Sequence, residues 1–240
     1  MKISVIGATG LIGSKVVDLL TSDGHDVVAA SRASGVDVLT GDGLTGALAG
    51  ADVLVDVVNS PSPEDGPAID FFTRSSANLV AAAKAAGVRH YVVLSIVGAD
   101  TLPESGYMRA KVTQEHTITA SGLPYTIVRA TQFQELTESI VAWLDAGDVV
   151  RAPDALIQPV ASDDVAAAVA HAATAAPRDG LVEIGGPEQI TFAEMARRVL
   201  AAQGSGKAVV VDADATYFGV PLQRASLVIG GSRQEHADVR

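Results

Sequence analysis

Short apolar runs alternate with longer stretches of helical period over the first 130 residues of the chain. The apolar runs cover residues 3–6, 27–30, 36–39, 53–58, 90–94 and 125–128, and the helical stretches cover residues 11–20, 44–48, 68–86 and 107–120. Apolar runs of this length are typical of strands that are buried on both faces of a parallel sheet. Their alternation with helices predicts an α/β fold, a doubly wound parallel sheet of Rossmann type with right-handed crossovers.

The first apolar run leads into three glycines at three-residue spacing, Gly7, Gly10 and Gly13, and then into a helix. Glycine permits a left-handed turn and a close approach of the backbone to a ligand. The free amides and positive dipole end of the following helix attract a pyrophosphate, to which the Thr9 hydroxyl can donate. The spacing departs from the usual Gly-x-Gly-x-x-Gly, but the flanking strand and helix predict a dinucleotide site here.

Residues after the second and third runs lie where an adenosine would bind. In a Rossmann unit an acid after the second strand selects the free 2′-hydroxyl of the ribose, and a base selects the 2′-phosphate. Arg32 stands there, which favours NADP(H) while leaving NAD(H) possible; a solvated loop charge is the alternative. Asp42 is placed either to contact the adenine amine or to form a turn. Asp56 lies inside an apolar run, so it needs a hydrogen-bond partner if it is buried.

Tyr107 and Lys111 are four residues apart on a predicted helix and therefore share one face. A phenol near its usual pKa of about 10 is a poor acid-base group at neutral pH, but an adjacent ammonium lowers that pKa. Tyr107 is therefore a candidate to exchange a proton with a substrate oxygen while hydride moves to or from a nicotinamide. Ser95 ends the strand before this helix and is the candidate to orient the carbonyl.

The stretches GATGLIG, LSIVGAD, YMRAK and SGLPYTIVRATQF occur in this order and resemble the short-chain dehydrogenase/reductase superfamily. More narrowly, they resemble its atypical, NmrA-like NAD(P)H-binding branch. The resemblance implies that Tyr107 and Lys111 are the catalytic pair and that Lys111 also binds the nicotinamide ribose. Many relatives have consecutive hydroxyl residues where this chain has Ser95, Ile96 and Val97. Either Ser95 is the third catalytic residue or the triad is incomplete.

The same resemblance assigns residues to the cofactor. It implies that the pyrophosphate is held by Gly7, Thr9, Gly10, Leu11, Ile12 and Gly13. It implies that the adenosine side is bound by Ser31, Arg32, Asp42, Val57, Val58 and Asn59. The carboxamide side of the nicotinamide is expected to contact Ala130, Thr131 and Phe133.

The second half of the chain predicts a smaller lobe. We expect a dinucleotide-binding domain at residues 1–130, with late segments from 150–185 joining it, and a mainly substrate-binding lobe at 131–240. Within the lobe we expect a helix near residues 140–144, strands near 149 and 208, and a frayed polar end at 230–240. Thr191 is a predicted helix cap with Glu194 at the capping-box spacing.

Composition narrows the class of protein. The formal charge of −11 and the absence of a basic cluster argue against binding to nucleic acid or to an anionic membrane. Without cysteine there is no disulfide or thiolate chemistry, and the five histidines have no metal-ligand spacing, so no metal site is expected. The chain has neither a leader nor an apolar stretch of membrane-spanning length, which predicts a cytoplasmic protein. The family resemblance implies either a monomer or a homodimer.

These observations predict an NADPH-dependent reductase of a small carbonyl or quinone-like compound, with Tyr107 as the acid. A non-catalytic NADP(H) sensor that binds a regulatory partner is the alternative, motivated by the open question of the serine. An isomerase or epimerase that uses its cofactor transiently is a third option.

Overall fold

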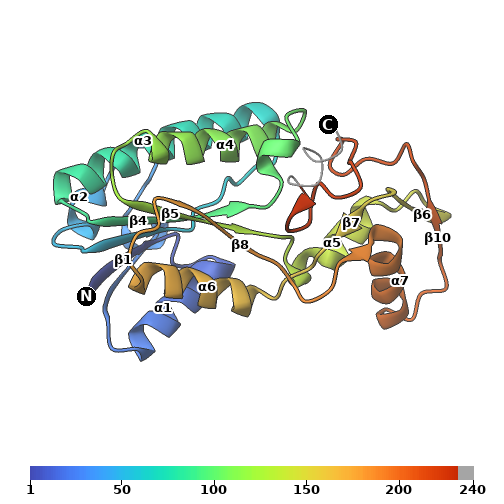
Figure 1. Ribbon diagram of the computed structural model, residues 1–240, viewed down its shortest axis with the longest axis horizontal. Coiled ribbons are helices and arrows are strands. Elements are labelled where there is room, and N and C mark those ends of the chain that lie inside the picture. The colour runs from blue at the N-terminus through green and yellow to red at the C-terminus, as the bar shows by residue number, and fades with distance from the viewer. Residues whose placement is uncertain (232–240) are drawn as a thin grey trace. The chain divides into compact units, whose positions relative to one another are not determined.

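A computed structural model describes residues 1–231 and contains a six-stranded sheet in the order β2-β1-β3-β4-β5-β8 (Figure 1). The strands are β1 (Lys2–Ile6), β2 (Asp26–Ala30), β3 (Val53–Asp56), β4 (His90–Ile96), β5 (Tyr125–Ala130) and β8 (Gly180–Ile184). β1 pairs in parallel with β2 and β3, and β3 pairs in parallel with β4. Because the chain leaves β1 first to one side and then to the other, the carboxyl end of β1 is a switch point, as in Rossmann folds. The predicted fold class is confirmed.

Helices cover both faces of this sheet. They are α1 (Leu11–Ser22), α2 (Leu44–Ala47), α3 (Asp65–Ala86), α4 (Gly106–Thr119) and α6 (Ser162–Thr174), with the 3-10 turn η1 (Arg32–Ser34) after β2. Figure 1 shows α3 and α4 on one face of the sheet and α1 and α6 on the other. Fully buried apolar side chains such as Leu54, Phe72 and Leu79 form the core between the sheet and α3. Burial on two faces explains why these strands read as apolar runs.

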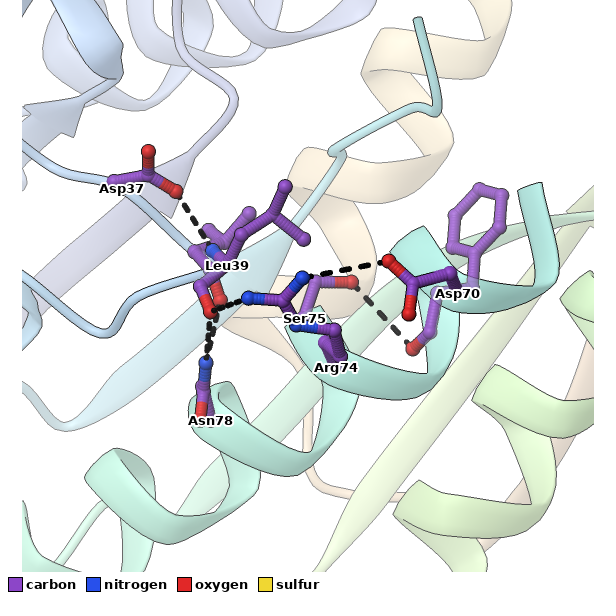
Figure 2. Close-up of polar contacts among 8 residues, drawn as sticks. Asp37, Leu39, Asp70, Arg74, Ser75 and Asn78 are labelled. Atoms are coloured by element: carbon purple, nitrogen blue, oxygen red, sulfur yellow. Dashed lines mark hydrogen bonds and ion pairs between the residues drawn. The ribbon is translucent and has the colours of Figure 1, made fainter. Parts of the chain in front are cut away.

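Residues 36–39 do not form the predicted third strand. Val36 and Val38 are buried as expected, but side chains occupy the backbone groups that a strand would pair. Asn78 of α3 donates to the carbonyls of residues 38 and 39, Arg74 donates to that of Leu39, and Asp37 accepts from the Leu39 amide (Figure 2). The segment is therefore a turn fixed to α3. An apolar run of four residues cannot reveal this, because burial and strand pairing are separate properties.

The chain divides into two compact units. The first comprises residues 1–95, 106–129 and 162–182, and the second comprises residues 96–105, 130–161 and the chain from 183 onward. The second unit contains η2 (Ala99–Thr101), η3 (Gln134–Leu136), α5 (Thr137–Trp143), β6 (Val149–Ala152), β7 (Leu156–Ile157), β9 (Ile190–Thr191), α7 (Phe192–Ala202) and β10 (Ala208–Val211). β10 pairs in parallel with β6, and β7 pairs antiparallel with β9.

Two sequence expectations concern helix ends and the C-terminus. The Thr191 hydroxyl accepts a 3.1 Å hydrogen bond from the Glu194 amide, so the predicted cap of α7 is confirmed. Of the polar segment 230–240, which we expected to fray, residues 232–240 lie outside the described part of the chain. Between residues 1 and 231 no helix has the length and apolarity needed to cross a membrane.

Candidate functional site

The carboxyl ends of β1, β2 and β3 lie level within the first unit, beside β4. Ile6 of β1 pairs with Ala30 of β2 on one side and with Asp56 of β3 on the other, and Asp56 pairs with Val93 of β4. The residues that follow β1, β2 and β3 at this edge are Gly7, Ser31 and Val57, whereas β4 continues to Ile96. Parallel pairing thus brings together strand ends that are up to 50 positions apart, since Gly7 and Val57 follow strands that pair with each other. This edge is where open α/β sheets bind their ligands.

The glycine loop after β1 is shaped by close backbone packing. Gly7 has a φ of +93°, and a Cβ on it would lie 2.9 Å from the carbonyl carbon and oxygen of Val57. A Cβ on Gly13 would lie 2.1 Å from the Gly7 carbonyl oxygen. Gly10 is exposed, and the nearest atom to its Cβ position is 3.3 Å away. The close backbone packing of the turn therefore requires glycine at positions 7 and 13. Gly10 is not required by packing, but without a side chain it leaves the exposed side of the loop open to a ligand.

The start of α1 has the properties of an anion site. Its cap position is Gly10, no side chain accepts from its first-turn amides, and its first turn contains no acidic residue. Leu11 is 44% exposed and Thr9 is exposed beside it. Free amides at the positive end of a 12-residue helix bind phosphate oxygens. A pyrophosphate therefore fits the loop at Gly7, Thr9, Gly10, Leu11, Ile12 and Gly13.

Arg32 follows β2 immediately and begins η1, with its side chain exposed. The turn is closed by two hydrogen bonds of 2.9 Å that Ser31 and Ser34 exchange across it. In residues 1–231 the Arg32 guanidinium forms no ion pair with a carboxylate. An unpaired guanidinium on a fixed turn at the end of β2 can bind a 2′-phosphate through its planar donor fork.

Asp42 lies in the exposed loop that precedes α2. Its carboxylate accepts a 2.8 Å hydrogen bond from the Thr40 hydroxyl, and its amide donates to the same hydroxyl. Its carbonyl accepts from the Asp37 amide at 2.9 Å. These contacts favour the turn-forming alternative for Asp42, although one carboxylate oxygen has no hydrogen bond to another described residue. Across the sheet edge, Val57 and Val58 are half-buried after β3.

Tyr107 lies in the first turn of α4, and its hydroxyl donates a 2.6 Å hydrogen bond to the Asn59 side chain after β3. Its ring packs edge-on against Phe72 of α3, at 5.9 Å between centroids. Burial raises the pKa of Tyr107 to about 12, and the bond to Asn59 offsets this only in part. The structure thus differs from the expected lowering of this pKa. At neutral pH the phenol is protonated, which suits a proton donor rather than a base.

Lys111 is 3% exposed, one turn further along α4. Its ammonium donates to the Leu94 carbonyl at 2.9 Å and to the Gln114 side-chain oxygen, and it lies 4.5 Å from the centroid of the Phe72 ring. Burial lowers its pKa to about 8, against the opposing charges of Asp56 and Glu115. The pKa of Tyr107 is set by its burial and by its bond to Asn59, without a contribution from Lys111. The hydrogen bonds of Lys111 to Leu94 and Gln114 use two of the three N–H groups of the ammonium.

Ser95 lies within β4, one residue before its end, rather than in a loop after the strand. The residue is 2% exposed, and its hydroxyl has no hydrogen-bond partner in the structure. Side chains alternate along a strand, so Ser95 faces the same side as Tyr91 and Val93, which pack against α3 and α4. Ile96 and Val97 follow it, and they bear no hydroxyl.

The remaining predicted cofactor residues belong to the second unit. Ala130 and Thr131 are buried, and Phe133 is half-buried at the start of η3. The Thr131 hydroxyl donates to the Gln158 carbonyl at 2.5 Å, so it already has a structural partner. Their assignment to the nicotinamide stays a prediction. Among residues 1–231 no group of three His, Cys, Asp or Glu side chains could hold a metal ion.

The sequence analysis assigned no role to Tyr91 or Gln114, and it left the hydrogen-bond partner of Asp56 open. Asp56 is fully buried and accepts from the Tyr91 hydroxyl and the Gln114 amide, each at 2.9 Å, and from the Val58 amide at 3.2 Å. The expected partner of the buried carboxylate is thus identified. Gln114 stands three residues after Lys111, a spacing that places both on one helix face and could have drawn attention to it.

Comparison with known proteins agrees with this geometry. A family model described as NAD(P)H-binding matches residues 7–176. The chain is 33% identical to (4-alkanoyl-5-oxo-2,5-dihydrofuran-3-yl)methyl phosphate reductase of Streptomyces griseus, over 80% of this chain and 70% of the relative. It is 30% identical to quinone oxidoreductase 2 of Escherichia coli strain K12, over 86% of this chain and 76% of the relative.

Solved structures share the fold. An NADPH-dependent quinone oxidoreductase of Escherichia coli, solved in complex with NADPH, superposes with a TM-score of 0.66 at 24% identity. The match covers 88% of this chain and 77% of that one. At this identity the likeness is evidence for the fold.

Proposed function

The chain belongs to the NAD(P)H-binding family that its residues 7–176 match, and from this premise we propose that it is an NADPH-dependent reductase of a small carbonyl or quinone-like compound. Its relatives include reductases by name, one acting on a furanone phosphate and one on quinones, which supports an oxidoreductase. The substrate class is the part of the proposal that goes beyond family membership.

The observation that carries the proposal is the link between the glycine loop and Tyr107. Gly7 packs against the backbone of Val57, and two residues later Asn59 accepts the hydrogen bond of the Tyr107 hydroxyl. A phenol proton is thereby held at the sheet edge that carries the phosphate-binding features. This arrangement suits a reaction in which a proton and a hydride are delivered to one substrate.

The cofactor preference rests on residues of the first unit. The amides of Leu11, Ile12 and Gly13 would bind the pyrophosphate, and Arg32 would bind the 2′-phosphate that distinguishes NADPH from NADH. Lys111 would donate its remaining N–H to the nicotinamide ribose. When bound, the reduced nicotinamide supplies the hydride.

The chain's own part in the reaction is to supply the proton. As hydride reaches the carbonyl carbon, the carbonyl π bond breaks and its electrons move to oxygen, where the Tyr107 proton is transferred. The phenolate left on Tyr107 is stabilised by the nearby Asn59 amide after rotation, and it recovers a proton from solvent. For a carbonyl substrate the balance is substrate plus NADPH plus one proton giving the alcohol and NADP⁺. A quinone would instead accept the hydride at one oxygen and the Tyr107 proton at the other, giving the hydroquinone and NADP⁺. A pKa of about 12 keeps the Tyr107 hydroxyl protonated at neutral pH.

Replacing Tyr107 with Phe tests the assigned acid. We expect turnover of NADPH with a quinone or aldehyde acceptor to fall by roughly 10²–10⁴-fold, since a positioned acid contributes about that much. The NADPH dissociation constant should change by less than about threefold, because the ring and its contact with Phe72 remain. Unchanged turnover in this variant, at unchanged cofactor affinity, would show that Tyr107 is not the proton donor.

A second candidate is a non-catalytic NADP(H) sensor. The environment of Ser95 favours it. This residue is buried, and the two residues that follow it are apolar and carry no hydroxyl. The same acceptor panel separates the two functions. Tight NADPH binding without turnover of any quinone, aldehyde or ketone would favour the sensor, whereas turnover that depends on Tyr107 favours the reductase.

We further propose a division of labour between the two units. Dinucleotide binding belongs to the first, which carries the glycine loop, Arg32, Asn59 and Lys111. Substrate selection belongs to the second, which carries the aromatic side chains of Trp143, Tyr217 and Phe218. Trp143 and Phe218 are 44% and 51% exposed, so they have ring surface available for an apolar substrate.

A further inference from the structure

Lys111 is connected to a buried carboxylate through one side chain, Gln114. The Gln114 oxygen accepts from the Lys111 ammonium, and the Gln114 amide nitrogen donates to the Asp56 carboxylate at 2.9 Å. Asp56 and Gln114 are 0% exposed and Lys111 is 3% exposed, so water does not substitute for these bonds. Asp56 and Gln114 lie 58 positions apart in the chain and on different elements, β3 and α4.

Donor and acceptor chemistry allows only one orientation of the Gln114 amide. A carboxylate only accepts hydrogen bonds and an ammonium only donates them. The amide must therefore direct its NH₂ to Asp56 and its oxygen to Lys111. The Tyr91 hydroxyl and the Val58 amide hold Asp56 in place by donating to its two oxygens. The orientation of Gln114 is thus set from β3 and β4, not by α4 alone.

We propose that Gln114, oriented by Asp56, is the positioning residue that keeps the Lys111 ammonium charged and aimed at the cofactor. The inference rests on the proposed function, in which Lys111 contacts the nicotinamide ribose. A buried ammonium without an acceptor loses its proton or turns away, because burial penalises the charged form. Gln114 and the Leu94 carbonyl are its two acceptors in the structure, and of these only Gln114 can be altered by substitution.

The charges that face Lys111 come from three elements. Asp56 of β3 and Glu115 of α4 both favour its charged form. Glu115 is engaged by Arg129 of β5 in a buried ion pair, so part of its field is compensated. β4 contributes the Leu94 carbonyl and the Tyr91 hydroxyl, and α3 contributes the face of the Phe72 ring. Burial still lowers the pKa of Lys111 to about 8, so the loss of one acceptor acts on a group close to deprotonation at neutral pH.

The test is the titration of Lys111 itself, followed by NMR of the lysine ε-methylene groups. The chain has five lysines, and the Lys111→Met variant identifies the resonance by its loss. In Gln114→Leu we expect the pKa of Lys111 to fall by about one unit or more, since an acceptor of the charged form is removed. The pH at which NADPH affinity begins to drop should fall by the same amount.

Two variants separate positioning from general destabilisation. Ile118→Val alters the buried core of the same helix without touching the network, so it should leave the titration of Lys111 unchanged. Gln114→Glu preserves the shape of the side chain and can share a proton with Asp56 while its other oxygen accepts from Lys111. It should return the pKa of Lys111 to the wild-type value or above.

The outcomes also separate this inference from the proposed function. If the Lys111 titration in Gln114→Leu matches that of the wild type while Lys111→Met binds NADPH at least tenfold more weakly, the positioning role is overturned and the function stands. If Lys111→Met binds NADPH as the wild type does, the cofactor contact is wrong and the inference is overturned with it. A lowered titration in Gln114→Leu, restored in Gln114→Glu, supports the inference.

Discussion

Arg32 and Lys111 are two basic residues of the first unit in opposite environments. Arg32 is exposed on a hydrogen-bonded turn, and in the described chain it pairs with no carboxylate. Lys111 is buried, and each of its hydrogen bonds goes to a group fixed by the core. An exposed arginine keeps its charge at every relevant pH, whereas a buried lysine changes its protonation with its surroundings. We therefore expect Arg32 to control the choice between NADPH and NADH, and Lys111 to make the function depend on pH.

Substitution of Arg32 by Ser should weaken NADPH binding by about 10- to 100-fold and leave NADH binding within about twofold, because a charge-assisted hydrogen bond to the 2′-phosphate is lost. Titration calorimetry with both cofactors measures this. Arg197→Ser, at an exposed position of α7, removes the same charge elsewhere and serves as the control. Equal weakening for both cofactors would mean that Arg32 does not contact the 2′-phosphate.

Among the elements, α1 and the loop before it depend on tight backbone packing at Gly13. Alanine there would place a methyl group 2.1 Å from the Gly7 carbonyl oxygen, so the loop must move. We expect Gly13→Ala to lower the free energy of unfolding by about 1–3 kcal/mol and to abolish measurable NADPH binding. Gly46→Ala is the matched control: this exposed glycine of α2 has nothing within 4 Å of its Cβ position. NADPH binding that survives Gly13→Ala would exclude this loop as the pyrophosphate site.

Helix α4 and strand β5 are joined by a buried ion pair. Arg129 donates to both oxygens of Glu115, at 2.9 and 2.7 Å, and the two side chains are 9% and 7% exposed. Removal of one partner leaves an uncompensated buried charge, so Glu115→Ala should lower the free energy of unfolding by about 3–5 kcal/mol. Glu188→Ala breaks the exposed pair with Arg198 and should leave the free energy of unfolding nearly unchanged, because solvent screens this pair. Urea unfolding measures both, and equal costs would contradict this account.

At the scale of the whole molecule, parallel strand pairing places the glycine loop, η1 and Asn59 at one edge of the first unit. It also buries the groups beneath that edge, because helices cover both faces of the sheet. Burial is the common cause of the three pKa shifts near the site: it raises the pKa of Asp56 and Tyr107 and lowers that of Lys111. The free energy of unfolding should therefore depend on pH through the titration of Lys111.

Lys111 has a pKa of about 8 in the folded chain against an ordinary value of 10.5. Between these values the unfolded chain binds a proton that the folded chain does not, so stability rises with pH across this window. Relative to Lys111→Met, the free energy of unfolding of the wild type should rise by up to about 1.4 kcal/mol per pH unit between pH 8 and 10. Urea unfolding of both proteins from pH 7 to 10 checks this. Parallel curves would show that the lysine is not held at a lowered pKa.

Local signals in the sequence were sufficient for much of this protein. Apolar runs and helical periods predicted β1 to β5, α1, α3 and α4, because strands buried on two faces and amphipathic helices are encoded by neighbouring residues. The spacing of the three glycines predicted the turn that β1 makes into α1. The four-residue spacing of Tyr107 and Lys111 placed both on one helix, and family membership confirms the resemblance carried by these motifs.

Tertiary structure alone decided three further properties. Residues 36–39 form a turn because Arg74 and Asn78 of α3 occupy their carbonyls. Lys111 faces Gln114 instead of lowering the pKa of Tyr107, and Asp56 finds partners on β4 and α4. The sequence by itself determined the glycine turn and, apart from residues 36–39, the strands and helices of the first 130 residues, since these depend on near neighbours. The tertiary structure decided hydrogen-bond partners and pKa values, since these depend on burial and on contacts between residues far apart in the chain.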